Sequence, residues 1–372
     1  MPELPNSARV VIVGAGFAGA ATAYHLTRMG MKDVVILERE SVPGAHASGR
    51  NAALLRRFVS RDPYGRLCQL GADRILDRLN TSHHMERKCG SLLLCRDDVR
   101  SRLERLVKED DSPGTPSLWL NREEAISRMP ILEDAFFDAA LYSPNDGILN
   151  LQNLLLFYLR EARTRGGRLF TSTPVVKILT NQKRITGVRT PSRTVQTGLV
   201  VNAAGAWAGA LASSADAVHA PLQPYRRHLF RLVPGSEGSA TLPWIWDLSR
   251  SYYIRPDTDG WIASCCDEEP HPPHAPRVAP DAALQLARVL IEHLPHSKTW
   301  SVDRTWACLR TFTADRQPLI GPDPVRPGFY WAAGLGGHGV TTSDIIGELT
   351  ARTILGQPLQ GPARSFDPKR YH

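Results

Sequence analysis

Residues 9–19 read RVVIVGAGFAG, and this stretch decides the fold of the first part of the chain. Four apolar, β-branched residues predict a short strand, which ends where the glycine pattern G-x-G-x-x-G begins. The alanine-rich segment 18–29 has high helical propensity, and an apolar run within 33–37 predicts another strand. The sequence therefore predicts a β–α–β unit with a glycine turn between its first strand and its helix.

The three glycines suit close contact with the pyrophosphate of a dinucleotide. Gly14 allows the tight turn, Gly16 lets the backbone approach the ligand, and Gly19 lets the helix pack closely on the strand. Glu38 ends the second strand at about the spacing expected of an acid that holds the ribose hydroxyls. The unit predicts a dinucleotide site, and at this point FAD and NAD both remain open.

The bulk composition fits a protein of two interleaved domains. The chain has 372 residues, of which 42% are hydrophobic and 22% charged, and its apolar runs have the length of strands rather than of membrane spans. The first residues lack the basic and apolar regions of a secretion signal, so we expect a cytoplasmic protein without a transmembrane segment. The oligomeric state is left open.

The charge and the cysteines argue against several other classes of protein. The net charge is +8, but the arginines are scattered and no nucleic-acid motif accompanies them, so we expect no nucleic-acid partner. We interpret the charge as a solvated surface able to attract anionic substrates. The six cysteines show no C-x-x-C spacing, which argues against a zinc site and a disulfide framework, and no metal site is predicted.

Three later segments favour FAD over NAD. Each is rich in small residues and offers a place where the backbone can pass close to a bulky planar ring: residues 46–53, 202–207 and 334–339. A nicotinamide enzyme does not need these additional close approaches. Residues 60–140, by contrast, are charged and helical in pattern, and we interpret them as an insertion outside the nucleotide-binding part.

These segments, together with Leu309-Arg310, resemble the D-amino-acid oxidase superfamily of flavoproteins, which includes glycine oxidase and sarcosine oxidase. Within it, the D-arginine dehydrogenase type is the nearest, through residues 222–224, 226–227, Tyr253, Trp306 and Arg310. The likeness spans nearly the whole chain. It implies an α/β fold, in which a Rossmann-like FAD-binding domain is joined to a discontinuous substrate domain with a mainly antiparallel β-sheet.

The resemblance also implies where the two domains lie. We expect the FAD-binding domain over residues 1–80, 145–220 and 313–372. The substrate domain is expected over residues 81–144 and 221–312.

The expected cofactor is FAD, bound non-covalently. The alternative is a covalent bond to Cys308, because sarcosine oxidase carries a cysteine at the matching position. Val176 is expected to meet the adenine, and the loop 334–341 to lie along the isoalloxazine. The full set of residues expected to contact FAD is Gly14, Ala15, Gly16, Phe17, Ala18, Gly19, Glu38, Arg39, His46, Ser48, Gly49, Arg50, Asn51, Ala52, Ala53, Val176, Ala203, Ala204, Gly205, Trp207, Arg310, Gly334, Gly336, Gly337, His338, Gly339, Val340 and Thr341.

Four side chains are expected at the substrate. Arg310 matches the carboxylate clamp of the superfamily, a task that suits a planar guanidinium; a structural salt bridge is the alternative. Tyr253 matches a tyrosine that binds the same carboxylate, with a half-buried strand residue as the alternative. Arg227 matches a second substrate arginine, and strand alternation sends the adjacent Arg226 to the other face. His338 is expected to be a contact rather than a base.

The expected reaction is oxidative deamination of a D-amino acid. A hydride would pass from Cα to flavin N5, the imine would hydrolyse to a 2-oxo acid, and oxygen or a quinone would take the electrons. Oxidation of a secondary amine such as sarcosine or proline, or of a 2-hydroxy acid, remains open, as does a non-catalytic flavin redox subunit. We expect a neutral or apolar substrate, because no glutamate stands near Gly90-Ser91 to pair with a cationic side chain, although Glu86 is close in sequence.

Overall fold

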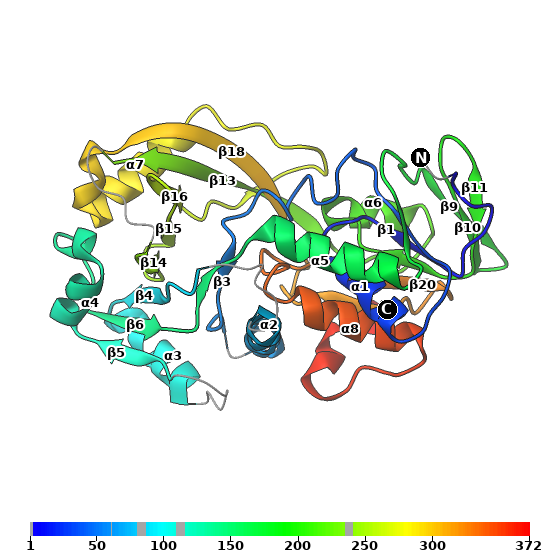
Figure 1. Ribbon diagram of the computed structural model, residues 1–372, viewed down its shortest axis with the longest axis horizontal. Helices are drawn as coiled ribbons and strands as arrows, with labels where there is room; N and C mark the ends of the chain where they lie inside the picture. The colour runs from blue at the N-terminus through cyan, green and yellow to red at the C-terminus, as the bar shows by residue number, and fades with distance from the viewer. Residues whose placement is uncertain (1–2, 61, 80–86, 109–115, 235–240) are drawn as a thin grey trace.

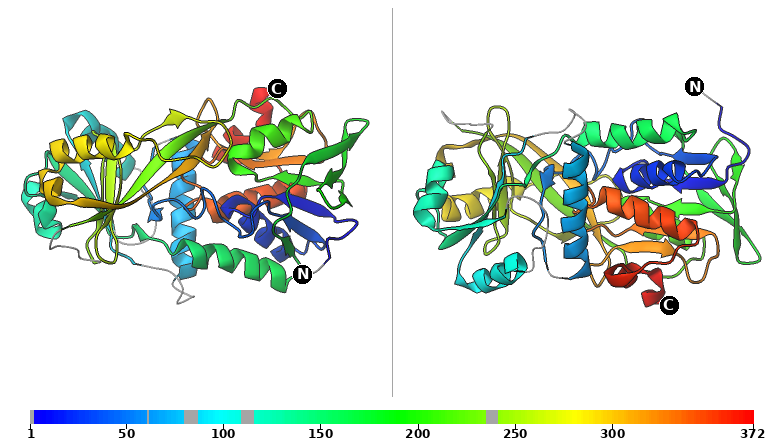
Figure 2. Two further views of the ribbon diagram at one scale, coloured as in Figure 1. Left: turned by 90° about the horizontal axis from the view of Figure 1, so that it is seen from above. Right: turned by 60° about the horizontal axis from the view of Figure 1, so that its bottom comes forward.

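A computed structural model describes residues 3–60, 62–79, 87–108, 116–234 and 241–372 of the chain (Figure 1). Glu86 lies outside these described residues. Two large sheets dominate the structure, one toward each end of the long axis, and the helix α2 (Pro63–Leu79) stands between them (Figures 1 and 2). Among the described residues, every helix is too short or too polar to cross a membrane.

The first sheet has six strands and contains the glycine turn. Its order is β19-β20-β12-β1-β2-β8, and all neighbours are parallel except β19 and β20. The bounds are β1 Val10–Val13, β2 Val34–Leu37, β8 Arg168–Phe170, β12 Val200–Asn202, β19 Leu319–Pro322 and β20 Phe329–Ala333. The strands are nearly all buried, which is why β1 and β2 are continuous apolar runs instead of alternating patterns.

Each face of this sheet has its own cover. Three helices that lie side by side in Figure 2 pack on one face: α1 (Phe17–Arg28), α5 (Leu151–Thr164) and α8 (Ser343–Ile354). On the other face lie α6 (Ala208–Ser213) and an antiparallel sheet of β9 (Lys177–Asn181), β10 (Arg184–Arg189) and β11 (Thr194–Gln196). The layered arrangement confirms the predicted α/β fold with a Rossmann-like part.

The second sheet has nine strands and is mainly antiparallel. Its order is β17-β13-β16-β15-β14-β4-β6-β5, with β18 on the other side of β13, and only β14 and β4 run parallel. The bounds are β4 Ser91–Cys95, β5 Leu118–Leu120, β6 Ala139–Ser143, β13 Gln223–Val233, β14 Trp244–Asp247, β15 Tyr252–Pro256, β16 Trp261–Ser264, β17 Glu269–Pro270 and β18 Ser301–Phe312. Strands β4 and β5 and the start of β6 lie within 60–140, so the helical interpretation of that segment was wrong in part.

The reason is local: the apolar run Leu92–Leu94 is completely buried, and its central strand position leaves no exposed face to produce alternation. The remaining elements are α3 Asp97–Lys108, α4 Arg122–Arg128, α7 Ala282–His293, and the short pair β3 Leu54–Leu55 and β7 Gly147–Ile148. Short 3-10 helices occupy Pro130–Leu132, Gly205–Trp207, Pro295–Thr299, Gly361–Phe366 and Pro368–Tyr371.

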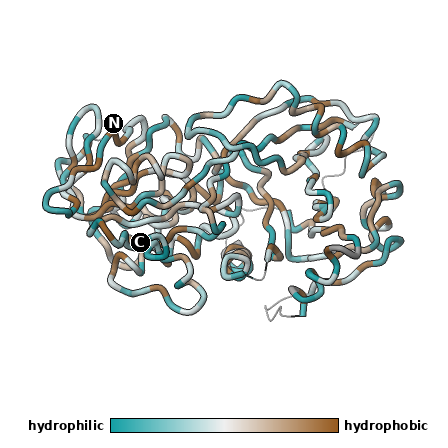
Figure 3. Tube along the Cα trace, turned by 180° about the vertical axis from the view of Figure 1, so that it is seen from behind, coloured by the Kyte–Doolittle hydropathy of each residue, from teal (hydrophilic) through white to brown (hydrophobic). Residues whose placement is uncertain are grey.

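Two long strands connect the halves of the molecule. β13 and β18 pair along almost their whole length and reach from the second sheet toward the first (Figure 1). Hydrophobic stretches occur in both halves (Figure 3), in keeping with separate buried clusters around each sheet. The residue boundaries of the two domains stay a prediction. What matters for the site is that β18 carries its side chains to the edge of the glycine turn's sheet.

Candidate functional site

The glycine turn follows β1 and leaves no room for side chains. Gly14 has φ +105°, and a Cβ there would lie 2.5 Å from the carbonyl oxygen of Ala203 at the end of β12. A Cβ on Gly19 would lie 2.0 Å from the carbonyl oxygen of Gly14. Only glycine allows this contact between turn, helix and neighbouring strand, which opens the amino end of α1 toward a ligand.

Polar side chains hold the turn in place. A carboxylate oxygen of Glu38 accepts a hydrogen bond from the backbone N–H of Ala15 at 2.7 Å, and its other oxygen accepts from the N–H of Glu40 at 2.9 Å. The hydroxyl of Ser48 accepts from the N–H of Phe17 at 3.1 Å. The end of β2 and the segment 46–53 are thus fastened to the start of α1. The role of Glu38 toward a ribose stays a prediction.

A cavity of about 380 Å³ extends from this turn to Arg310. It brings together most of the residues predicted to contact FAD, namely Gly14, Gly16, Phe17, Ala18, Glu38, Arg39, His46, Ser48, Arg50, Asn51, Val176, Ala203, Ala204, Gly205, Trp207, Arg310, Gly334, Gly336, Gly337, Gly339 and Val340. The other predicted residues are not among those that line it: Ala15, Gly19, Gly49, Ala52, Ala53, His338 and Thr341. Several of these pack behind the wall, since Gly19, Ala52 and Ala53 contact other protein atoms or belong to buried clusters.

One end of the cavity has a polar cover. The guanidinium of Arg39 lies 4.1 Å from the ring centroid of Trp207, and the ring of His46 lies 4.7 Å from the same side chain. Glu40 joins Arg39 and His46, and hydrogen bonds from His46 and Arg39 lower the pKa of its carboxyl. All three ring or guanidinium groups line the cavity, so they are placed to close over its ligand.

The other end of the cavity presents a cation. Arg310 lies on β18, and one of its terminal nitrogens donates to the sulfur of Cys308 at 3.0 Å. Among the residues that the structure describes, no carboxylate forms an ion pair with Arg310. Burial opposes its charge, but the thiol of Cys308 and the phenol of Tyr253 raise its pKa overall. A Cβ on Gly337 would lie 2.9 Å from its Nε, so the glycine loop rests on the guanidinium.

Tyr253 faces this cation from β15. The side chain is 2% exposed, and its hydroxyl has no hydrogen-bond partner within the described part of the chain. Burial raises the pKa of the phenol, against the nearby charge of Arg310. A buried hydroxyl without a partner is costly, and its position beside an uncompensated cation points to a ligand that binds both groups.

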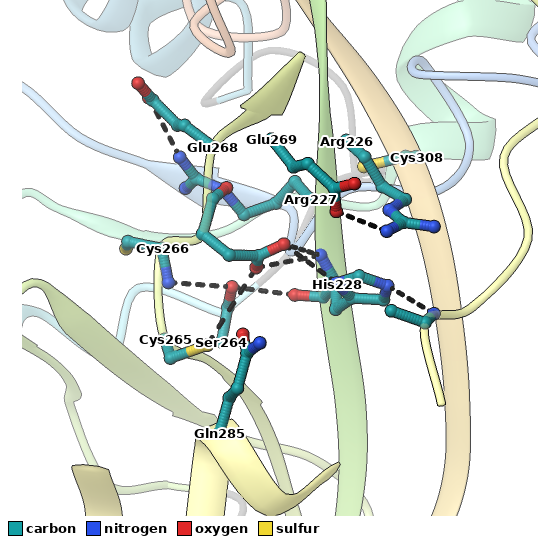
Figure 4. Close-up of polar contacts among 12 residues, drawn as sticks. Arg226, Arg227, His228, Ser264, Cys265, Cys266, Glu268, Glu269, Gln285 and Cys308 are labelled. Atoms are coloured by element: carbon teal, nitrogen blue, oxygen red, sulfur yellow. Dashed lines mark hydrogen bonds and ion pairs between the residues drawn. The ribbon is translucent and has the colours of Figure 1, made fainter. Parts of the chain in front are cut away.

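Arg227, in contrast, already has protein partners. Its Nε donates to the carbonyl oxygen of Asp267 at 2.7 Å, and a terminal nitrogen pairs with Glu268 at 3.1 Å (Figure 4). Arg226 pairs with Glu269, as Figure 4 also shows. The predicted second substrate arginine is therefore largely neutralised by Glu268, and its role toward a substrate stays a prediction.

The buried His228 extends the same pattern. Its Nδ1 lies 2.8 Å from a carboxylate oxygen of Asp267, and its Nε2 accepts from the N–H of Ala279 at 3.0 Å (Figure 4). Three successive basic residues of β13 thus meet the three successive acids 267–269. These pairs hold the segment after β16 across the end of the site, and Pro276 of that segment lines the cavity.

His338 lies between the cavity wall and several arginines. Its Nδ1 has no partner among the described residues, and its ring meets that of Tyr64 edge-on at 5.6 Å. Burial, and then the charges of Arg56, Arg310 and Arg227, lower the pKa of His338 to about 3. The imidazole is neutral near pH 7, which suits the predicted contact role.

Cys308, the predicted alternative site of a covalent link, lines the cavity, and its bonding to a flavin remains a prediction. The structure also brings forward residues that the sequence did not indicate. Pro276 lines the cavity, whereas Glu268 pairs with Arg227 and Arg56 stacks on Trp246 outside the lining residues. None of the three belongs to a motif, and distant loops bring them back onto β13 and β14. Within the described residues, no group of three or more His, Cys, Asp or Glu side chains is placed to hold a metal ion.

Comparison with known proteins gives the site its context. Residues 9–353 match the family model described as "FAD dependent oxidoreductase". Human mitochondrial sarcosine dehydrogenase is 27% identical over 389 positions, which cover 99% of this chain and 42% of that protein. The mitochondrial regulatory subunit of pyruvate dehydrogenase phosphatase from Mus musculus is 26% identical over 95% of this chain and 42% of that protein. The chain spans less than half the length of these relatives.

A solved structure shares the whole fold. The L-proline dehydrogenase from P. horikoshii superposes with a TM-score of 0.89 at 24% identity, covering 99% of this chain and 98% of that one. The residues present fit FAD, the cofactor of the matched family. At Gly14, Gly16 and Gly337 a Cβ would lie 2.9 Å or less from a neighbouring protein atom. These positions therefore require glycine, and their backbone is free of side chains where the cofactor must approach.

Proposed function

Because the chain belongs to the family of FAD-dependent oxidoreductases, whose model spans residues 9–353, we propose that it oxidises the C–N bond of a small amino acid. Arg310 holds the substrate by its carboxylate. A partly buried cation without a carboxylate partner costs free energy, and a substrate carboxylate offsets that cost with two charge-assisted hydrogen bonds. The uncompensated guanidinium of Arg310 is the observation that carries the proposal.

The chain's own groups bind and orient the substrate. Arg310 binds the carboxylate, and the free hydroxyl of Tyr253 donates to it, so the Cα–H bond is directed toward the cofactor. His338 stays neutral and adds no further positive charge near the amine, which must also be neutral to react. The segment 267–279 excludes water from this end. Bound FAD supplies a two-electron oxidant that accepts a hydride.

A secondary amine is the favoured substrate. The named relatives include a sarcosine dehydrogenase and an L-proline dehydrogenase, and both names refer to a secondary amine with a neighbouring carboxylate. The D-amino acid expected from the sequence stays a prediction, as do the 2-hydroxy acid alternative, the electron acceptor and the cytoplasmic location. We retain the division into an FAD-binding and a substrate domain as part of the proposal.

A non-catalytic role is the second candidate. The pyruvate dehydrogenase phosphatase relative is named as a regulatory subunit, so the fold alone does not imply turnover. Arg310 favours catalysis, because a purely regulatory flavoprotein has no need of an uncompensated cation beside the cofactor. The two candidates differ in whether any amino acid reduces the bound flavin.

The test is anaerobic bleaching of the flavin absorbance by a panel of N-methyl amino acids, prolines, D-amino acids and hydroxy acids. We expect rapid bleaching by at least one secondary amino acid. Arg310→Met should lower kcat/KM about a thousandfold, because a buried charge pair loses one partner. The matched control is Arg226→Met, which removes a pair between a partly buried arginine of the neighbouring strand and the exposed Glu269, and should leave turnover nearly unchanged. No bleaching by any panel member contradicts the proposal.

Acid denaturation of the same FAD-loaded protein shows whether FAD is bound covalently. If acid denaturation leaves colour on the chain of the native protein but releases it from Cys308→Ala, the link is covalent; complete release from the native protein establishes non-covalent binding.

A further inference from the structure

A second arginine near the proposed substrate site lacks a counter-charge. Arg56 follows β3, and its side chain is nearly buried, with the residue 8% exposed. Its Nε donates to the carbonyl oxygen of Phe58 at 2.7 Å, and its guanidinium stacks on the ring of Trp246 at 4.2 Å from the centroid. Within the described ranges, no carboxylate forms an ion pair with this guanidinium.

The acid that acts most strongly on Arg56 is poorly placed to neutralise it. Asp146 is completely buried, and its two oxygens accept hydrogen bonds from the hydroxyl of Ser91 at 2.7 Å and from the N–H of Arg57 at 3.1 Å. Burial raises the pKa of Asp146 to about 6, which still leaves the carboxylate mainly ionised near pH 7, but within the described residues it forms no ion pair with Arg56. Burial lowers the pKa of Arg56 to about 10, which still leaves the guanidinium charged near pH 7.

Contacts connect Arg56 to the Arg310 end of the site. The ring of Trp246, on which Arg56 stacks, lies 4.9 Å from the ring of Tyr253. Tyr253 carries the free hydroxyl beside Arg310. Both arginines also act on the same two partly buried groups, His338 and Cys266. Two guanidinium groups that lack a carboxylate ion pair among the described residues, Arg310 on β18 and Arg56 in the loop after β3, therefore act on one region.

Two cations in one enclosed region repel each other unless anions join them. The carboxylate of a simple amino acid provides one anion, which Arg310 takes under the proposed function. A guanidinium stacked on an indole keeps its hydrogen-bonding edge free, and that edge suits a carboxylate. The uncompensated charge of Arg56 remains, and a second anionic group on the substrate would satisfy it.

We propose that Arg56 is a specificity residue that binds a second acidic group, so that the preferred substrate is a small amino-dicarboxylate. The inference rests on the proposed function and narrows it. The sequence alone led us to expect a neutral or apolar substrate, because no acid was found to pair with a cationic side chain. That expectation did not include the cation of Arg56, and the preference for a second acidic group replaces it. The distance between the two carboxylates is set by the separation of Arg56 and Arg310.

The experiment uses pairs of compounds that differ by one carboxylate. Sarcosine is compared with iminodiacetate, and D-alanine with D-aspartate, as reductants of the FAD-loaded protein. In whichever pair reduces the flavin, the kcat/KM of the dicarboxylate should be at least about tenfold higher than that of the monocarboxylate. Arg56→Gln should lower that value about a hundredfold, while turnover of the monocarboxylate changes less than about threefold. Arg56→Lys keeps the charge and should restore part of the preference.

Binding provides a readout that does not depend on turnover. Malonate and succinate should perturb the flavin spectrum of the native protein at lower concentration than acetate and propionate, and Arg56→Gln should abolish that difference. The visible spectrum and thermal midpoint of each variant show whether it retains its fold. If Arg56→Gln does not fold, the comparison of Arg56→Lys with the native protein decides.

The outcomes separate the two levels of the proposal. A preference for the monocarboxylates, or equal binding of mono- and dianions by the native protein, overturns the role of Arg56 and leaves the proposed oxidation intact. Failure of every amine in the wider panel to reduce FAD overturns the proposed function itself. A dianion preference that survives in Arg56→Gln also overturns the assignment, because another residue must then hold the second anion.

Discussion

The two ends of the cavity differ in how their polar groups are satisfied. At the glycine turn, the carboxylate of Glu38 and the hydroxyl of Ser48 accept hydrogen bonds from backbone N–H groups of the turn and helix. At the opposite end, Arg310 has no carboxylate partner and the hydroxyl of Tyr253 has no partner at all among the described residues. The cofactor end is complete within the protein, whereas the substrate end is completed by its ligand. Substitutions at the first should cost stability, and substitutions at the second should cost turnover.

The largest effect is expected at the turn. Gly14→Ala adds a Cβ 2.5 Å from the carbonyl oxygen of Ala203 at a φ of +105°, so we expect a loss of roughly 3 kcal/mol or more in the free energy of unfolding, with weaker FAD binding. Urea unfolding and flavin content measure both. Gly198→Ala is the control, since no atom lies within 4 Å of its Cβ. Equal stability of the two variants would show that the turn is not rigid.

Tyr253→Phe tests the substrate end, where we expect a loss of turnover without a loss of stability. Removing a buried hydroxyl that has no partner leaves nothing unsatisfied, so the free energy of unfolding should stay the same or rise by up to about 1 kcal/mol. Turnover should suffer, with kcat/KM about tenfold lower, because the substrate carboxylate loses one hydrogen bond. Urea unfolding and steady-state kinetics on the same preparation measure the two effects. A marked loss of stability would mean that the hydroxyl has a structural partner.

A smaller effect is expected from Glu268→Gln. This change removes the charge that neutralises Arg227 and also pairs with Arg316, so the released cation should tighten the binding of simple carboxylates about threefold. Flavin-monitored titration with propionate gives the dissociation constants. Glu269→Gln is the matched control, because it releases only the outward Arg226 and should change nothing measurable. The same shift in both variants would point to a general effect of surface charge.

The smallest effect concerns His338. Its pKa of about 3 lies below the ordinary value of 6.5, so the unfolded chain takes up a proton first as the pH falls. The contribution of neutral His338 to the free energy of unfolding is constant above about pH 6.5. That contribution is lost as the pH falls from about 6.5 toward 3. Near neutrality the side chain does not titrate, and His338→Gln should leave the shape of the kcat/KM profile between about pH 6 and 8 unchanged. Loss of an ionisation in that range would identify His338 as a proton-transfer group.

Local patterns in the sequence predicted the strand, turn and helix at the cofactor end, whereas the residues of the substrate end came from family resemblance, and the reason is physical. The strand, turn and helix from Val10 to Arg28 are specified by neighbouring residues, and Glu38 follows at a spacing set by one β–α–β unit. Arg310 and Tyr253 were found through family resemblance. The pairing of Arg227 with Glu268 spans 41 residues and depends on where the segment after β16 returns, which no local pattern encodes.

Two other features were missed because their burial depends on tertiary packing. Strand β4 within 60–140 shows no alternation because both its faces are covered. Arg56 gave no signal, since an arginine in a sequence is ordinarily a surface residue, and only the packed structure shows that its charge is buried against Trp246 without an acid.

The most direct test of the central claim, that Arg310 holds the substrate carboxylate, is a double comparison of anaerobic flavin bleaching. The rates with sarcosine and with its carboxamide are measured in the native protein and in Arg310→Met. If the carboxylate binds Arg310, the bleaching rate with the carboxamide should be lower than with sarcosine by at least about a hundredfold in the native protein. In Arg310→Met the two rates should differ by less than about threefold. A carboxamide penalty of the same size in both proteins would contradict the claim, because the carboxylate would then be recognised without Arg310.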